Sequence, residues 1–133
     1  MSGIGLKVFA TRIAFATVLS MITLIPHEFL HALCFKEDVY LYHDFSKGLL
    51  FVHGIEKMSK ARFVFMSMLP NLVFGFVPFA VFLCNPQWYM LGLCSAMCIS
   101  MGFGDYINVF NAITQMPKGA ETYLHKFHSY WVK

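Results

Sequence analysis

The sequence predicts a mainly α-helical integral membrane protein, with three transmembrane helices and a small cytoplasmic β-hairpin between helices one and two. Of its 133 residues, 58% are hydrophobic and only 13% are charged, whereas a soluble domain carries about 25% charged residues. Three apolar runs each reach the roughly 20 residues that a membrane-spanning helix needs. We therefore expect one membrane-embedded domain over residues 1–133.

The first helix is expected over about residues 8–35. Its apolar run lacks the small-x-small site of a cleaved signal peptide, so we expect it to be retained. Pro26 cannot donate a backbone hydrogen bond, which predicts a kink just before His27. Small residues on the His27 face would let a neighbouring helix approach closely. These residues are Ala16, Ser20 and Thr23.

A β-hairpin is expected over about residues 38–54, because two runs rich in β-branched and aromatic residues flank a turn signal. An exposed edge of this hairpin could hold an extended substrate by strand addition. Equally, the hairpin could simply cap the helices. The second helix is expected over about residues 61–84, and it carries Asn71 in its apolar interior.

The third helix is expected over about residues 88–112, followed by a C-terminal tail over 113–133. Small residues recur at every fourth position, a pattern that brings membrane helices together. They are Gly92, Ala96, Ser100 and Gly104. In a straight helix this ridge lies nearly opposite Asp105, so it would pack on helix two or on a second copy of the chain in a homo-oligomer.

Lysine and arginine residues are concentrated in the loop after the first helix and in the C-terminal tail, against only Lys7 and Arg12 at the other side. The positive-inside rule therefore predicts a multi-pass protein of the cell membrane with loop 36–60 and the C-terminus in the cytoplasm. In this arrangement the two histidines of the first helix, Asn71 and Asp105 lie at a similar depth. The net charge is only +3 and no basic block is interleaved with aromatics, which argues against a nucleic-acid partner.

The chemical signal is the sequence His27-Glu28-Phe29-Leu30-His31, an HExxH pattern. Residues four apart on a helix share a face, so both imidazoles can bind one Zn²⁺ ion while Glu28 lies beside it as general base. Ionisable groups inside an apolar segment are expensive, which favours a functional role for them. The predicted reaction is metal-assisted hydrolysis of a peptide bond.

A catalytic zinc takes three protein ligands and keeps one position for water. Asp105 is the expected third ligand, because it is acidic and lies at the depth of the histidines. Histidines from the cytoplasmic segments are the alternatives for this position. They are His43, His53, His125 and His128. Asn71 is expected either to donate to the oxyanion of the reaction or to form an interhelical hydrogen bond.

HEFLHAL on the first helix, the hairpin-like insertion and GDYINVFNAITQMPKGA near the C-terminus resemble the small bacterial membrane proteins classed as putative zincin peptidases. That family is similar to intramembrane metalloproteases of the site-2 type. The resemblance implies a three-helix core with zinc on His27, His31 and Asp105 and with Glu28 as the base. The chain departs from the site-2 pattern NxxPxxxxDG, since Tyr106 follows the aspartate and the Asn85-Pro86 pair lies far upstream.

The sequence thus predicts an intramembrane zinc metalloprotease that acts within the lipid bilayer on a membrane-embedded or membrane-proximal peptide. A non-catalytic membrane adaptor with a structural metal, or with none, is the alternative. Glu28 separates the two, because a structural zinc needs no base beside it. A metal-ion carrier fits less well, because acidic and histidine residues do not recur along a path through the helices.

Overall fold

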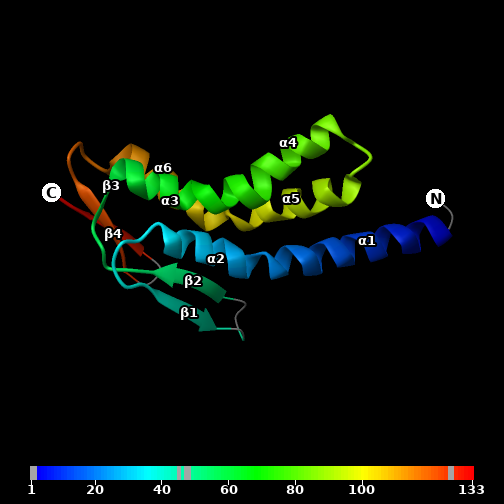
Figure 1. Cartoon of the computed structure of the whole chain (residues 1–133), viewed down its shortest axis with the longest axis horizontal. Helices are drawn as coiled ribbons and strands as arrows, with labels where there is room; N and C mark the ends of the chain where they lie inside the picture. Colours follow the sequence, from blue (N-terminus) through cyan, green and yellow to red (C-terminus); the bar gives the residue numbers. More distant parts are fainter. Residues whose placement is uncertain (1–2, 45, 47–48, 126–127) are drawn as a thin grey trace.

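The computed structural model describes residues 3–44, 46, 49–125 and 128–133 and is mainly helical, as the sequence predicts. Figure 1 shows an elongated molecule with the N-terminus at one end and the C-terminus at the other. The helices run along its length, and the strands gather near the C-terminal end. Two helices are long and apolar enough to cross a membrane, or up to three if a bent helix pair counts as one span.

The first predicted helix is present as α1 (Gly3–Ile22) and α2 (Leu24–Leu33). The two follow each other as one apolar stretch of 29 residues from Gly5 to Leu33. The interruption at Thr23 follows from Pro26, which has no N–H to offer the carbonyl of Ile22. Within the first turn of a helix, however, proline is tolerated, so α2 continues past it to the HExxH residues.

The second predicted helix is present as α3 (Lys60–Asn71), η2 (Leu72–Phe76) and α4 (Val77–Cys84). Ser59 caps α3, where its hydroxyl accepts a hydrogen bond from Arg62 N. The element η2 is a π-helical turn in which the N–H of Val77 bonds to the carbonyl of Leu72. Such widened turns are frequent at functional sites, and this one directly follows Asn71.

The third predicted helix is divided into α5 (Tyr89–Met101) and α6 (Phe103–Gln115), which meet at Gly102 with a bend of 50°. The predicted ridge of small residues, from Gly92 to Gly104, is therefore divided between two helices that meet at an angle. Gly92 packs on helix two, since a Cβ there would lie 2.7 Å from the Phe82 ring. Ala96, Ser100 and Gly104 are exposed within this chain.

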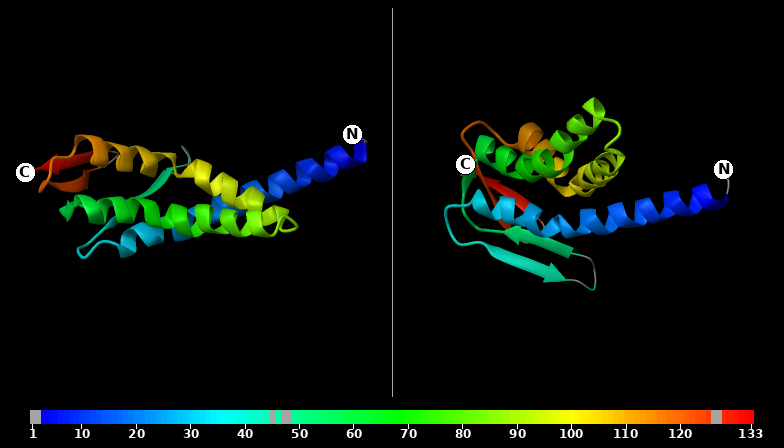
Figure 2. Two further views of the ribbon diagram at one scale, coloured as in Figure 1. Left: turned by 90° about the horizontal axis from the view of Figure 1, so that it is seen from above. Right: turned by 45° about the vertical axis from the view of Figure 1, so that its right-hand side comes forward.

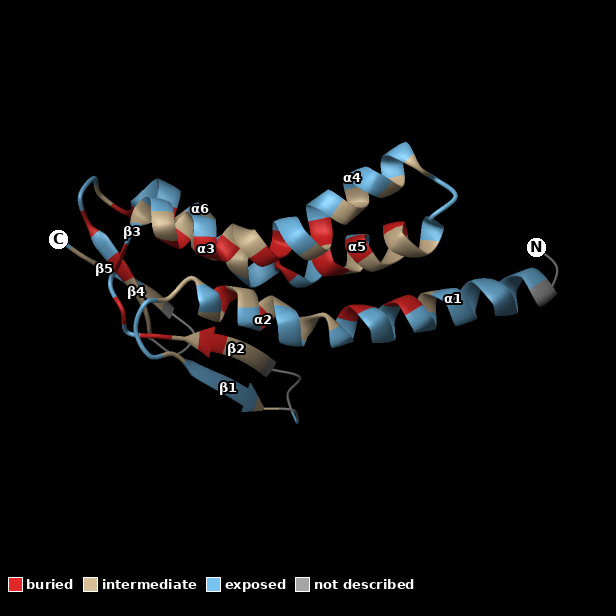
Figure 3. Ribbon diagram, viewed as in Figure 1, coloured by how far each residue is buried: buried red, intermediate tan, exposed pale blue. Residues whose placement is uncertain are grey.

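The face of α1 that carries small residues packs closely against a neighbouring helix, as the sequence predicts, and this helix is α5. Ala16 and Ser20 are 0% and 1% exposed. Ser20 Oγ lies 3.3 Å from the carbonyl oxygen of Cys94, and Thr23 Oγ1 lies 3.3 Å from Cys98 Sγ. Figure 3 shows the buried parts of the helices along the seam between α1–α2 and the other helices, with the outward faces exposed.

The predicted hairpin is present as β1 (Tyr40–Asp44) and β2 (Leu49–His53), paired antiparallel with Leu41 opposite Val52. Figures 1 and 2 show it running alongside α2 rather than beyond the end of that helix, and β2 is the strand in contact with α2. The hairpin is thus placed at the level of the HExxH residues.

The C-terminal segment, for which the sequence analysis assigns no secondary structure, contains β4 (Glu121–His125) and β5 (His128–Val132). They extend the short strand β3 (Met58–Ser59) into an antiparallel sheet in the order β3-β4-β5. Met58 from this sheet packs with α3 and α6 in a buried cluster. Its other buried members are Phe63, Met66 and Ala112.

An ion pair fixes the loop between the hairpin and α3. The buried carboxylate of Glu56 accepts hydrogen bonds from the N–H groups of Lys36 and Glu37 at 2.6 and 3.2 Å and from Arg62 at 2.5 Å. The Arg62 guanidinium also donates to the carbonyl of Cys34 at 2.6 Å. These contacts tie the C-terminal end of α2 to the start of α3.

Candidate metal centre

The two histidines of the HExxH sequence lie on one face of α2. Their ring centroids are 4.9 Å apart, as expected for residues one helical turn apart. His31 is 8% exposed and Glu28 is 7% exposed. A nitrogen of each histidine and a carboxylate oxygen of Glu28 lie within 4.8 Å of one another, the one such group of potential metal ligands among the described residues.

Asp105 reaches both histidines from α6. His27 Nε2 lies 3.2 Å from Asp105 Oδ2, and His31 Nε2 lies 3.3 Å from Asp105 Oδ1. The bend at Gly102 places Asp105 in the first turn of α6, where the exposed N–H groups of a helix favour a negative charge. The structure therefore brings together the three residues that the sequence analysis assigns to a metal.

The donor set fits a zinc ion. Ligands at zinc distances of about 2.0–2.2 Å in a tetrahedral arrangement lie about 3.3–3.6 Å apart, close to the two distances between the imidazoles and Asp105. His31 Nδ1 lies 3.0 Å from the carbonyl oxygen of Met66. Because a carbonyl only accepts, this nitrogen carries the proton, and Nε2 of the neutral ring presents a lone pair to the carboxylate. Two acceptors face each other in this tautomer, an arrangement that either a proton or a metal cation between them would stabilise.

Glu28 is held by the hairpin rather than by a helix. Its Oε2 accepts a hydrogen bond from the backbone N–H of Val52 at 2.8 Å. Leu41 and Val52 face each other across the hairpin, and the N–H of Val52 points away from β1 toward α2. One carboxylate oxygen of Glu28 is thereby fixed beside the histidines. Sequence reasoning could not find this contact, because a backbone N–H leaves no side-chain signal.

Asn71 lies behind Asp105 and is 1% exposed. Its Nδ2 donates to Asp105 Oδ2 at 2.7 Å and to the carbonyl of Ser67 at 3.0 Å. Its Oδ1 lies 3.3 Å from the hydroxyl of Tyr106, which also lies 2.8 Å from the carbonyl of Ile99. Both amide hydrogens of Asn71 are thus engaged within the protein, one of them with the carboxylate.

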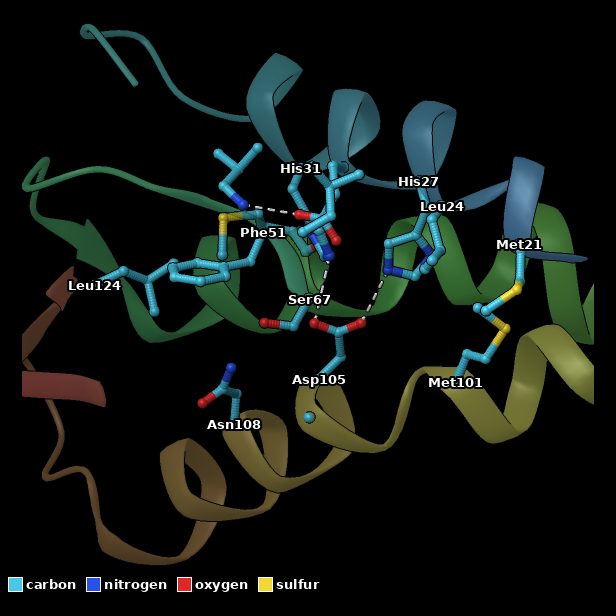
Figure 4. Close-up of a pocket in the computed structure, with 15 residues that line it drawn as sticks. Met21, Leu24, His27, His31, Phe51, Ser67, Met101, Asp105, Asn108 and Leu124 are labelled. Atoms are coloured by element: carbon cyan, nitrogen blue, oxygen red, sulfur yellow. Dashed lines mark hydrogen bonds and ion pairs between the residues drawn. The ribbon is translucent and has the colours of Figure 1, made fainter. Parts of the chain in front are cut away.

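A pocket of about 500 Å³ opens over these residues, a volume within the range of ligand-binding sites. Figure 4 shows His27, His31 and Asp105 facing one another, with Ser67 and Asn108 on one side and Met21 and Met101 on the other. Leu50, Phe51 and Val52 of the hairpin also line the pocket. Sequence reasoning missed Ser67, although its position one helical turn before Asn71 could have indicated it.

The alternative histidines do not reach this pocket where they are described. Neither His43 nor His53 is among its lining residues. The His53 ring instead stacks on Tyr40, with centroids 5.5 Å apart. The side chains of His125 and His128 lie outside the described part of the structure.

Comparison with known proteins gives one match. No curated protein and no solved structure matches the chain. The profile of one protein family, described as putative zincin peptidase, matches residues 20–121 and so covers most of the chain, including the HExxH residues, Asn71 and Asp105. The chain therefore belongs to the putative zincin peptidase family.

Proposed function

We propose that this protein is an intramembrane zinc metallopeptidase of the site-2-protease type, which hydrolyses a peptide bond in a membrane-embedded or membrane-proximal substrate. The observation that carries the proposal is the convergence of His27, His31 and Asp105 in a pocket that also contains the carboxylate of Glu28. Family membership supports a peptidase, and the apolar helices support a site within a membrane.

The placement in the membrane is supported by contacts at the two ends of the molecule. The guanidinium of Arg12, near the middle of α1, lies 4.5 Å from the centroid of the Tyr89 ring at the start of α5. This contact joins α1 to the region of the turn between α4 and α5. At the other end, β3 pairs with β4, so the loop before α3 lies beside the C-terminal segment. Three crossings of the bilayer would place the turn between α4 and α5 on one side of the membrane, and the loop before α3 and the C-terminal segment on the other. The excess of basic residues then assigns the loop and the C-terminus to the cytoplasm.

His27, His31 and Asp105 would hold the zinc ion. When bound in such a site, zinc lowers the pKa of a water molecule toward about 7 and polarises a substrate carbonyl. The carbonyl of Met66 keeps the His31 ring in the tautomer that leaves Nε2 free to bind. Asn71 holds the carboxylate of Asp105 in place from the opposite side.

Glu28 is the general base. Its carboxylate takes a proton from the water that attacks the peptide carbonyl and passes it to the amine that leaves. The hydrogen bond from Val52 fixes one oxygen of this carboxylate and leaves the other for the proton transfer. A site that served only to hold a structural metal would have no use for this arrangement.

The hairpin provides a strand edge to which a peptide substrate could bind. Leu50, Phe51 and Val52 of β2 line the pocket, and the edge of β2 that faces away from β1 lies beside α2. A substrate in an extended conformation could add to this edge by hydrogen bonds to backbone groups other than the Val52 N–H, which is already bonded to Glu28. Such an addition would place its backbone beside Glu28.

Metal analysis tests the site. We expect one zinc per chain in the purified protein, no zinc in His27→Ala or His31→Ala, and weaker binding in Asp105→Ala. Zinc retained at full affinity by Asp105→Ala but lost when His43 is replaced would assign the third ligand to the hairpin.

Cleavage of fluorescein-labelled casein by the detergent-solubilised protein tests the reaction. Glu28→Gln should keep its zinc and lose cleavage by about a hundred-fold or more, since general base catalysis contributes about 10²–10⁴. Equal rates for the wild type and Glu28→Gln, with stoichiometric zinc in both, would contradict a peptidase and favour the adaptor with a structural metal.

A further inference from the structure

Ser67 has a buried hydroxyl that the protein leaves without a hydrogen bond. The residue is 0% exposed, and its Oγ has no partner within the described part of the chain. Two other serines in the apolar helices are buried to a similar degree but are satisfied. Ser20 donates to the carbonyl of Ala16 at 2.7 Å, and Ser95 donates to the carbonyl of Leu91 at 2.7 Å.

The pattern at Ser20 and Ser95 is the usual one for serine in a helix, where the hydroxyl bonds to the carbonyl one turn earlier. Ser67 departs from this pattern, since its hydroxyl makes no such bond, and the residue lines the pocket of the metal centre. Figure 4 draws this hydroxyl between Phe51 and Asn108, on the side of the pocket away from His27. A buried polar group without a partner is destabilising, so a ligand that supplies the partner would explain why the position is polar.

Asn71 cannot supply a donor to the substrate in this arrangement. One of its amide hydrogens bonds to Asp105 and the other to the carbonyl of Ser67. The side chain of Ser67 is the donor on the same face of α3, one turn closer to the hairpin, and its hydrogen is not engaged. The sequence analysis expects Asn71 either to donate to the oxyanion or to form a hydrogen bond between helices. In the structure Asn71 has the second role, and the first is left to Ser67.

We propose that Ser67 is a catalytic residue that donates a hydrogen bond to the carbonyl oxygen of the peptide bond being cleaved, while Asn71 is a positioning residue for Asp105. The inference rests on the proposed peptidase function. Ser67 keeps its proton throughout, and no base lies within hydrogen-bond distance of its hydroxyl among the described residues. The hydroxyl of the attacking water joins the carbonyl carbon, the C–N bond breaks, and Glu28 carries the remaining proton to the amine.

The test compares Ser67→Ala, Ser67→Thr and the matched control Ser95→Ala in cleavage of fluorescein-labelled casein, zinc content and Tm. We expect Ser67→Ala to lose about a hundred-fold in kcat with little change in KM, to keep its zinc, and to melt at the same or a higher temperature. Ser67→Thr should recover part of the lost rate. Ser95→Ala should keep its rate and melt at a lower temperature, because it loses a satisfied hydrogen bond.

Measurements of zinc affinity distinguish the proposed role of Asn71 from that of Ser67. Asn71→Ala should bind zinc about 10–100-fold more weakly, whereas Ser67→Ala should not. Wild-type kcat in Ser67→Ala, in an assay where Glu28→Gln is inactive, would overturn the role of Ser67 and leave the peptidase intact. Wild-type cleavage by Glu28→Gln would instead overturn the proposed function and the inference with it.

Discussion

Gly102 is the position where one added methyl group should do most damage to the metal centre without touching a metal ligand. It joins α5 to α6 at the 50° bend. A Cβ built there would collide with Asn71 Oδ1, and it would lie 2.6 Å from Asn71 Cγ and 2.9 Å from the hydroxyl of Tyr106. The backbone itself would accept alanine, because φ is −72°. Gly102→Ala is therefore a steric perturbation aimed at Asn71.

The expected loss of stability follows from three contributions. Overpacking of a well-packed position costs about 1–3 kcal/mol. If Asn71 swings away to relieve the overlap, it also gives up its hydrogen bond to the Asp105 carboxylate, worth about 1.5–3 kcal/mol. Replacement of glycine by alanine at a compatible φ contributes about 0.4–1 kcal/mol in the opposite direction. The net destabilisation of Gly102→Ala should be about 2–5 kcal/mol.

Gly104→Ala is the matched control, because a Cβ at that position has nothing within 4 Å. It should leave the free energy of unfolding unchanged or raise it by up to about 1 kcal/mol, as expected for glycine replaced in a helix. Both variants are compared by Tm in detergent and by zinc affinity in competition with a chelator. Gly102→Ala should melt lower and bind zinc about 10–100-fold more weakly. If it matched Gly104→Ala in both measurements, the coupling of the bend to Asp105 through Asn71 would be refuted.

Two further predictions concern the loop and the orientation in the membrane. Burial raises the pKa of Glu56, but the hydrogen bonds from Arg62 and from the two backbone N–H groups outweigh burial and leave the pKa below its ordinary value of 4.5. The ionised carboxylate therefore stabilises the fold above that pH and loses this effect as the pH falls through the lowered pKa. Glu56→Gln should lower the free energy of unfolding by about 1–3 kcal/mol at pH 7, and its Tm should fall less steeply than that of the wild type as the pH is lowered. Parallel curves of Tm against pH for the two proteins would contradict this. The second prediction uses a cysteine-free version of the chain with a single cysteine introduced at Lys118 or at Lys7. In intact cells, the cysteine at Lys118 should be shielded from an impermeant thiol reagent, and the one at Lys7 should react. The reverse pattern would place the metal centre near the outer face of the membrane.

The helices and the hairpin could be predicted from the sequence because each depends on local composition. The apolar runs gave the three helical segments within a few residues, and the turn signal gave the pairing of β1 with β2. The strands β4 and β5 could not be predicted in this way. They are short, and β4 is specified by pairing with Met58 and Ser59, more than sixty positions earlier in the chain.

The candidate site was accessible to sequence reasoning only in part. HExxH spacing and the acidic residue in the third apolar run point to His27, His31 and Asp105, and the structure places the three together. Gly102 and Gly104 indicate that the third helix could loosen just before Asp105, but glycine is common in straight membrane helices as well as at bends, so sequence reasoning leaves the division at Gly102 open. The partners of Glu28 and His31 are backbone groups of Val52 and Met66, whose position depends on tertiary packing alone.

The buried polar side chains around the metal centre have hydrogen-bond partners within the protein, and Ser67 is the exception. Glu28 is bonded to a backbone N–H, His31 to a backbone carbonyl, and Asn71 to a backbone carbonyl and to Asp105. In a low-dielectric surrounding each of these bonds is strong, and each unpaired group is correspondingly costly. The polar groups around the metal centre are thus fixed before any ligand arrives. Of the two buried side-chain atoms without a partner among the described residues, His53 Nδ1 and Ser67 Oγ, only the second belongs to a residue of the pocket. Among the buried polar side chains at the metal centre, the Ser67 hydroxyl is therefore the one to which we assign a hydrogen bond with the substrate.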